Sequence, residues 1–424
     1  MTAPAASPAP AAATGTFRSL ANRNFRLWFL GAIVSNVGTW MQRTAQDWLV
    51  LTELAHVNGA SAVGIVMGLQ FGPLALMLPF SGFAADYFDR RRLVFLTQLA
   101  SGLLALGLGL LTVLGLVQLW HVYVFAFLLG CVAAFDAPAR QTFIGELVGE
   151  ADLANAVALN STSFNAARMI GPAVAGVLIA AVGTGWVFLI NAASFVAVIG
   201  SLCLLRAADF HPRTRAVRSR GSFIGGFRYV WGRPDLRAVL LMLFLIGTFG
   251  LNFPIFISTM AVHAFQAGAG EYGVLSSTMA IGSVAGALLA ARRATPTLPL
   301  LAGAALLFGA GCALAAVMPT TWAFGILLVV IGVAAQTFTT STNSLVQLST
   351  DSAMRGRVVA LLLAIAVGGT PLGAPIVGWV ADVAGPRWSL GLGAASGFLA
   401  ALVGVRYLVK HTGWRLWREI KTSA

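Results

Sequence analysis

The sequence predicts an all-α integral membrane protein, with twelve transmembrane helices in two pseudo-symmetric six-helix bundles. Three observations predict it: the composition, a series of long apolar stretches, and an internal repeat. The 424 residues are 58% hydrophobic and 10% charged, with a mean hydropathy of +0.84. An average soluble domain carries about 25% charged residues. A soluble fold of this length cannot bury so much apolar surface, whereas a lipid bilayer can solvate it.

Twelve apolar stretches each approach the roughly 20 residues that a helix needs to cross the hydrocarbon. The first six spans are expected over 24–51, 61–84, 92–117, 121–144, 156–181 and 186–205. The second six are expected over 237–261, 272–291, 298–318, 321–345, 358–382 and 388–409. An even number of spans places both termini on the same side of the membrane.

The Lys and Arg residues indicate which side that is. With the N-terminus inside, the inner segments hold all of the 27 basic residues except Arg43 and Arg387. Basic residues favour the cytoplasmic side of a membrane. We therefore expect a multi-pass protein of the inner (cytoplasmic) cell membrane with both termini in the cytoplasm. Topology also explains the net charge of +13, and no nucleic-acid partner is expected.

The spans divide the chain into five segments. These are a disordered cytoplasmic N-terminal tail (1–22), an N-terminal six-helix bundle (23–206), a cytoplasmic basic linker (207–236), a C-terminal six-helix bundle (237–409) and a cytoplasmic C-terminal tail (410–424). The N-terminal tail lacks the basic start and apolar core of a signal peptide. The arginines of the linker fit either a solvated segment that obeys the positive-inside rule or a contact with anionic lipid.

The two halves resemble each other at an offset of 202 residues. The matched pairs are Gly171 with Gly373, Gly176 with Gly378, Gly183 with Gly385, Trp186 with Trp388, and Arg90-Arg91 with Arg292-Arg293. These matches fall in three regions in the same order, which indicates a duplicated six-helix unit. Repeated halves are the usual architecture of secondary transporters.

A short charged turn follows the second span, where Gly82 and Asp86 precede Arg90, Arg91 and Arg92. With twelve spans and a repeat, this Gly-x-x-x-Asp-x-x-x-Arg-Arg-Arg pattern resembles the signature of the major facilitator superfamily. The resemblance implies the major facilitator fold and a cytoplasmic gate built from charged residues. The gate residues are expected to be Gly82, Asp86, Arg90, Arg91, Asp136 and Arg140. The alternative is a solvated turn that only stops translocation.

Within this gate, Arg90 is expected to bridge to Asp136. Asp136 and Arg140 are four residues apart and would share a helix face if the helix continued. Pro138 lies between them, and a proline in a helix interior removes a backbone hydrogen bond. We therefore expect an interruption of the helix there.

A second motif, Gly171-Pro172 followed by Gly176, resembles the antiporter motif of the superfamily, with Ala175 in place of one glycine. Gly373, Pro375 and Gly378 occupy span eleven. Gly and Pro let these helices bend or pack closely, so the two halves are expected to touch there. Thr39–Gln42, Trp48–Val50 and Phe135–Gln141 further resemble the enterobactin-exporter-like group, described as transmembrane secretion effectors.

The resemblance implies a secondary active transporter that exports a small organic molecule (a drug, siderophore or metabolite) by proton-coupled antiport with alternating access. An uptake permease of the same fold and a non-transporting membrane sensor or assembly partner are the alternatives. No Walker motif or nucleophile–base arrangement is present, so we expect no enzymatic activity. We expect no cofactor or metal, and a monomer whose partners are a small-molecule substrate, protons and the lipid bilayer.

Charged and polar residues inside the spans are the candidates for the cavity. Asp47 is the leading candidate for proton coupling, with Arg43 holding it ionised until cargo or a conformational change separates them. An outer structural salt bridge is the alternative. Arg168 either binds anionic cargo or extends to the inner interface. Asp382 is expected to form an outer latch with Arg387. The remaining candidates are Gln42, Gln46 and Asn36.

Overall fold

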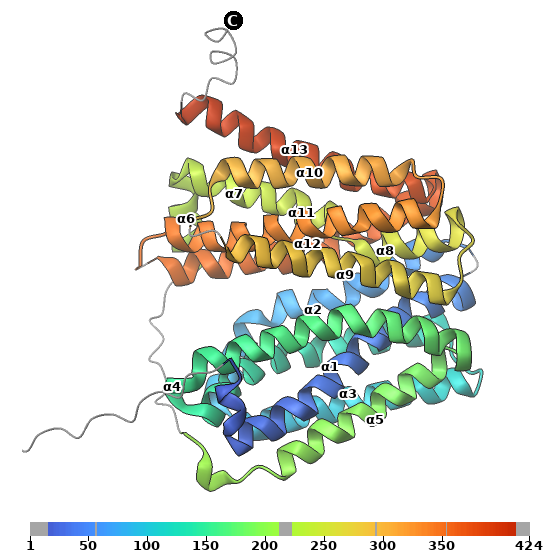
Figure 1. Cartoon of the computed structure of the whole chain (residues 1–424), viewed down its shortest axis with the longest axis vertical. Helices are drawn as coiled ribbons and strands as arrows, with labels where there is room; N and C mark the ends of the chain where they lie inside the picture. The colour runs from blue at the N-terminus through green and yellow to red at the C-terminus, as the bar shows by residue number, and fades with distance from the viewer. Residues whose placement is uncertain (1–15, 56, 212–222, 293–294, 353, 413–424) are drawn as a thin grey trace, which may run out of the picture.

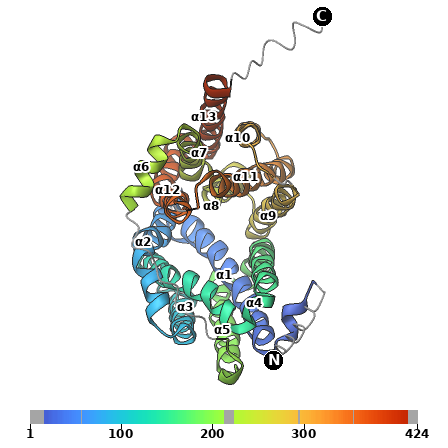
Figure 2. The same cartoon turned by 90° about the vertical axis from the view of Figure 1, so that its left-hand side faces the viewer.

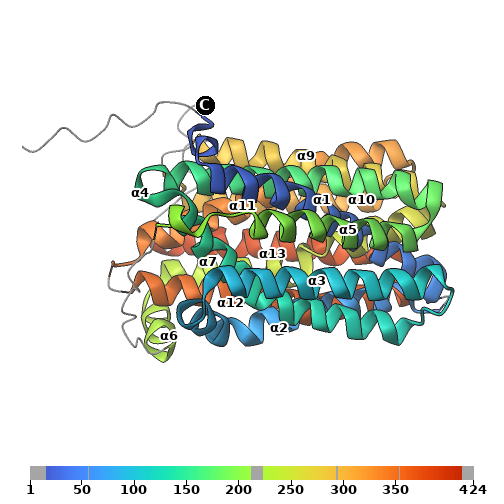
Figure 3. The same ribbon diagram turned by 90° about the horizontal axis from the view of Figure 1, so that it is seen from below.

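The structure of the chain is a computed structural model that describes residues 16–55, 57–211, 223–292, 295–352 and 354–412. Within these ranges it is built from helices without any β-strand. The helices run roughly along one common direction (Figures 1 and 3). Seen along that direction, the helices form two groups (Figure 2).

The first group contains five helices. They are α1 (Arg23–Leu49), α2 (Gly59–Tyr87), α3 (Arg90–Val113), α4 (Leu119–Val182) and α5 (Thr184–Cys203). A π-helix, η2 (Val50–Leu54), extends α1. Helix α4 crosses twice, because it turns back at Gly149, whose φ of 67° is readily adopted by glycine (Figure 1). The sequence therefore places spans four and five correctly but misses that one non-helical residue is enough to join them.

The second group contains seven helices, preceded by the short α6 (Phe223–Gly232). They are α7 (Pro234–Leu245), α8 (Phe253–Thr259), α9 (Ala269–Ala291), α10 (Leu298–Ala316), α11 (Thr321–Ser349), α12 (Arg355–Ala384) and α13 (Pro386–Thr412). Ten helical segments of the described chain are long and apolar enough to cross a membrane. Counting α4 as two spans and adding the more polar α1 gives the twelve predicted spans.

Span seven differs from the single helix predicted over 237–261. It consists of α7, the π-helix η4 (Ile246–Gly250), a break at Leu251 and Asn252, α8, and the π-helix η5 (Met260–Ala264). The Asn252 side chain donates to the Thr248 carbonyl at 2.7 Å, and Pro254 brings no amide hydrogen to the first turn of α8. Irregular backbone at membrane depth is tolerated where it lines a cavity, and Leu251 does so.

The two halves meet through two pairs of helices. Helix α2 packs on α12, and the second arm of α4 packs on α9. The offset of 202 residues relates span two to span eight (α9) and span five to span eleven (α12). The two contacts therefore exchange with each other under the pseudo-twofold axis, which is the arrangement that a duplicated unit requires.

Glycines permit the closest approaches at these two contacts. A Cβ added at Gly378 of α12 would lie 2.3 Å from the Ala60 carbonyl oxygen of α2, and one at Gly176 of α4 would lie 2.7 Å from the Ala269 carbonyl oxygen of α9. The other glycines of the two motifs make contacts within their own halves. Gly171 lies against Trp40 in the first half, and Gly373 lies against Thr248 in the second half.

The ends of the predicted segments need correction. Residues 16–22 were assigned to a disordered tail, but they contain the 3-10 helix η1 (Arg18–Ala21), which is anchored on α4. The buried Ser19 donates to Asn155 at 2.6 Å, and Arg18 pairs with Asp152 at 3.0 Å. The predicted linker (207–236) includes α6 and a short 3-10 helix, η3 (Ala207–Asp209). The remainder of the predicted N-terminal tail (1–15), the linker arginines within 212–222, Arg293 and residues 413–424 lie outside the described residues.

A methyl group at the α2–α12 contact tests this packing. Gly378→Ala forces the new Cβ against a backbone carbonyl, which cannot rotate away, and overpacking of this kind costs about 1–3 kcal/mol. We expect a lower thermal unfolding midpoint for the purified protein in detergent. Gly303→Ala on α10 is the matched control, because a Cβ there meets nothing within 4 Å. Equal midpoints for the two variants would contradict the close contact.

Candidate functional site

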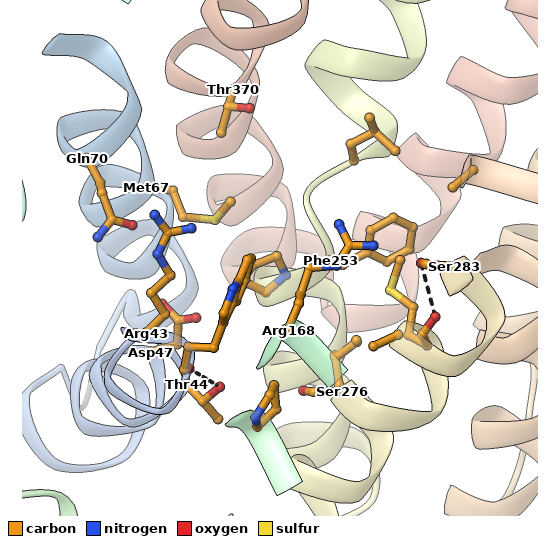
Figure 4. Close-up of a pocket in the computed structure, with 18 of the residues that line it drawn as sticks. Arg43, Thr44, Asp47, Met67, Gln70, Arg168, Phe253, Ser276, Ser283 and Thr370 are labelled. Atoms are coloured by element: carbon orange, nitrogen blue, oxygen red, sulfur yellow. Dashed lines mark hydrogen bonds between the residues drawn. The ribbon is translucent and has the colours of Figure 1, made fainter. Parts of the chain in front are cut away.

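A cavity of about 380 Å³ lies between the two halves. Its walls come from α1, α2 and α4 of the first half and from the Leu251 break, α8, α9, α11 and α12 of the second (Figure 4). Pockets of about 300–1,000 Å³ hold small organic molecules. The cavity therefore has the size and the position between two bundles that a transported molecule requires.

Helix α1 brings a polar face to this cavity. Trp40, Arg43 and Asp47 are spaced by three and four residues, so they lie on one side of the helix, and Gln46 is beside them. Asp47 and Gln46 are buried in the protein. Two of the predicted proton-coupling residues, Arg43 and Asp47, thus face a common space together with Gln46.

The Arg43 guanidinium is held mainly by aromatic rings. Its Cζ lies 4.9 Å from the centroid of Trp40 and 5.6 Å from that of Phe71, distances at which a cation is attracted to a ring face. Within the described residues no ion pair or hydrogen bond joins Arg43 to Asp47, and Arg43 Nε is buried without a hydrogen-bond partner. The two opposite charges interact through space rather than as the structural salt bridge that was the alternative.

Asp47 also lies at the boundary between the halves. Its carboxylate is close to the hydroxyl of Tyr272 on α9, which is also near Ser276. The neighbouring Trp48 stacks on Tyr272, with ring centroids 5.7 Å apart. A change in the charge of Asp47 therefore acts directly on a contact between the two halves.

Arg168 faces the cavity from the second arm of α4, near Phe253 (Figure 4). Of the two predicted orientations, the structure has the one directed into the cavity. Within the described part of the chain, the Arg168 side chain has no hydrogen bond or ion pair. The cavity wall also includes Gln70, Phe71 and Phe253, which the sequence did not single out because single polar or aromatic residues in apolar spans are common.

Two predicted cavity residues lie elsewhere. Asn36 accepts a hydrogen bond from Arg140 at 3.1 Å, and Gln42 accepts one from Asn191 of α5. Both are buried inside the first half. They join helices of that half and do not line the cavity, because the polar face of α1 divides between its own bundle and the space between the bundles.

The predicted gate residues form two separate charge pairs. Asp136 accepts hydrogen bonds from Thr97 and Gln98 of α3 and pairs with Arg140 at 2.9 Å. The expectation that Pro138 interrupts the helix is wrong, since α4 continues through it. Neighbouring helices and local adjustments satisfy the groups that a proline leaves free in a membrane span.

Arg90 pairs with Glu146 of α4 at 2.5 Å, so the predicted bridge from Arg90 to Asp136 is wrong. Arg91 donates to the Leu202 carbonyl of α5 at 2.7 Å. Glu146 lies ten residues beyond Asp136, about 15 Å along a helix, and the sequence alone does not fix which of them reaches α3. Gly82 and Asp86 belong to the last turns of α2, but the surroundings of these two residues lie outside the described part of the chain.

Asp382 makes a contact between the two halves, with a partner other than the predicted Arg387. Its carboxylate accepts hydrogen bonds from the Ala60 amide at 3.0 Å, the Ser61 amide at 2.7 Å and the Ser61 hydroxyl. The predicted pair with Arg387 is wrong, because Arg387 donates to the Ala316 carbonyl at 2.7 Å. A carboxylate at a helix N-terminus is stabilised by the exposed amides and the helix dipole. Asp382 of one half thus caps α2 of the other.

Comparisons of the sequence with known proteins identify the family of this chain and related transporters. Residues 14–415 match the family described as transmembrane secretion effector. The multidrug efflux pump Tap of Mycolicibacterium fortuitum is 29% identical over 85% of this chain and 89% of its own. The enterobactin exporter EntS of Shigella boydii serotype 4 (strain Sb227) is 25% identical over 93% of both chains.

Solved structures share the fold. A bacterial homolog of the human lysosomal transporter Spinster, in an inward-facing and occupied conformation, has a TM-score of 0.72 at 16% identity, covering 95% of this chain and 100% of that one. A POT family transporter in complex with 5-aminolevulinic acid has a TM-score of 0.73 at 10% identity, covering 92% of this chain and 96% of that one.

Removing the charge of the Asp382 latch tests its role. Asp382→Asn replaces charge-assisted hydrogen bonds, which contribute about 1.5–3 kcal/mol, so the contact between α2 and α12 should open more often. We expect Ser276→Cys in the cavity, in a background without the three natural cysteines, to react about tenfold faster with a membrane-impermeant maleimide applied from the Asp382 side. Asp209→Asn, an exposed carboxylate away from the latch, is the control. An unchanged labelling rate would show that the cap does not hold this end closed.

Proposed function

We propose that this chain, which belongs to the transmembrane secretion effector family of the major facilitator superfamily, exports a small organic molecule by proton-coupled antiport with alternating access. The observation that carries the proposal is the cavity between the halves, with Asp47 placed against Tyr272 of the opposite half. Export is supported by relatives that are named as efflux proteins over most of their length.

Alternating access is supported by the contacts that the described residues of the two halves make at the end near Asp382. Near Asp382, glycine-mediated contacts and the carboxylate cap hold α2 against α12, and Gly176 meets α9. The Ser277 hydroxyl also donates to the Met169 carbonyl at 2.9 Å. The positive-inside rule assigns this end to the cell exterior. In our proposal these contacts close the exterior end of the transporter in an inward-facing state.

The charge pairs at the arginine-rich end would serve the opposite state. Arg90 pairs with Glu146, and Thr97 donates to Asp136, which also pairs with Arg140 of its own helix, so these groups connect α3 and α4 within the first half. In our proposal this rigid cluster, with Gly82, Asp86 and Arg91, forms the cytoplasmic gate when the halves rock toward each other. The basic residues serve topology as well, whereas the carboxylates are needed for the gate.

Asp47 couples protons to this motion because its charge acts on a contact between the halves. An ionised Asp47 carboxylate attracts the nearby Tyr272 hydroxyl and the Arg43 guanidinium, and a protonated one attracts both more weakly. Proton binding and the conformational equilibrium are then linked, since a ligand shifts an equilibrium when it interacts differently with the two states.

Neutralising Asp47 tests the coupling. We expect Asp47→Asn to reduce pH-gradient-driven accumulation of a transported dye in proteoliposomes to background, while the protein still binds that dye. The probes are fluorescein and rhodamine 123, and Asp209→Asn is the control because it removes an exposed carboxylate outside the cavity. Wild-type accumulation by Asp47→Asn would remove this residue from the coupling role.

The direction of transport is tested with oriented membrane vesicles. An exporter should accumulate the same dyes in inside-out vesicles whose lumen is acidic, because the lumen then corresponds to the cell exterior. Right-side-out vesicles with an acidic exterior should not accumulate them. Accumulation confined to the right-side-out vesicles would favour the uptake permease. Binding without gradient-driven flux in either orientation would favour a sensor.

A further inference from the structure

We propose that the cavity selects an amphipathic organic anion, with the negative group held between Arg168 and Arg43 and an aromatic or otherwise flat apolar body against the ring-lined walls. This inference names the substrate class of the proposed transporter and so rests on that proposal. It depends on which polar groups of the cavity lack partners.

The charges of the cavity wall do not balance. The charged residues that line it are Arg43, Arg168 and Asp47, which leaves one positive charge in excess. All three come from the first half. Asp47 is opposite Tyr272, and no carboxylate of the described wall contacts Arg168. A cationic cargo would face two guanidinium groups, whereas an anionic cargo would neutralise the excess charge.

The unpartnered polar atoms of the cavity wall are mainly hydrogen-bond donors. Arg43 Nε, Gln70 Nε2 and Trp40 Nε1 are buried without a partner in the described protein. Gln70 is 8% exposed. Figure 4 shows Arg43 extending toward Gln70. A buried donor without an acceptor is costly, so a small rotation of these side chains toward the cavity would let a ligand rich in oxygen acceptors satisfy donors that this protein leaves unpaired.

The remaining surface suits an aromatic body. Trp40 and Phe71 flank the Arg43 guanidinium, and Phe253 lies on the opposite wall near Arg168. Rings of this kind stack on flat ligands, and apolar walls with a few placed polar groups are typical of small-molecule sites. A carboxylate, sulfonate or catecholate on an aromatic scaffold combines both requirements.

An anionic cargo also fits the energetics of export. The cell interior is electrically negative, so the membrane potential drives an anion outward and a proton inward. Exchange of one proton for one anion therefore moves two charges in the favourable direction. Because Asp47 acts on the contact with Tyr272, the proton and the anion need not compete for one side chain.

Two dyes that share a xanthene core test the proposal. Fluorescein is anionic and rhodamine 123 is cationic, and fluorescence anisotropy measures the binding of each to the full-length protein in detergent at one fixed pH. We expect fluorescein to bind more tightly. Arg168→Gln and Arg43→Gln should each weaken fluorescein binding about tenfold, the effect of losing one charged hydrogen-bond donor, and leave rhodamine 123 binding equal or tighter.

The matched control is Arg228→Gln, which removes an exposed arginine of α6 outside the cavity and should leave both affinities unchanged. Tighter or equal binding of rhodamine 123, absence of fluorescein binding, or fluorescein affinity that survives both cavity variants would overturn the proposal. Gradient-driven transport of rhodamine 123 alone would overturn anion selectivity and leave export intact. Selective fluorescein binding without flux would support this inference and contradict transport.

Discussion

Hydrocarbon cannot solvate a charge or an unpaired backbone group, and the rest of this structure depends on that constraint. It explains why the described chain is helical and why the break in span seven occurs where the backbone meets a cavity. It also decides where ionisable side chains lie. Each must have a partner, reach an interface or face a water-accessible space, and the charged residues of this protein divide among these three solutions.

The Asp136 network is the fully paired solution. The Asp136 carboxylate accepts hydrogen bonds from Thr97, Gln98 and Arg140. Arg140 also donates to Asn36, so these hydrogen bonds join α1, α3 and α4 into one rigid unit. The Asp382 cap differs because its donors belong to the other half. A hydrogen bond within one half makes that half more rigid, whereas a hydrogen bond between the halves stabilises one arrangement of the two halves. The cavity charges follow neither pattern, since Arg43 and Arg168 keep donors that the protein does not use.

The sequence predicts much of the fold because the bilayer requires long apolar helices and the repeat constrains their order. It predicts less of the site, for reasons visible at single residues. Gln42 and Gln46 lie four residues apart on α1, yet Gln42 faces its own bundle and Gln46 faces the cavity. Rotation of the helix decides between them, and neighbouring helices set that rotation. Similarly, α4 offers two carboxylates, Asp136 and Glu146, to which Arg90 could pair. Arg90 pairs with Glu146 because the position of the first turn of α3 along α4 brings these two side chains together. The contact between Asp382 and Ser61 joins residues 321 positions apart, for which no local pattern exists.

The repeat makes the chemical asymmetry of the cavity informative. At the offset of 202 residues, Gln70 corresponds to Tyr272 and Arg168 corresponds to Thr370, and all four line the cavity. The pseudo-twofold axis therefore passes through the site, and both halves present the same positions to it. The charges are nevertheless confined to the first half, because Arg43 and Asp47 correspond to Leu245 and Phe249. If the halves are copies, as the repeat indicates, this divergence leaves the charged groups of the cavity on one half and an apolar, hydroxyl-bearing wall on the other. In the proposed mechanism, rocking the halves would separate a bound anion from the wall of the second half without separating it from Arg43 and Arg168.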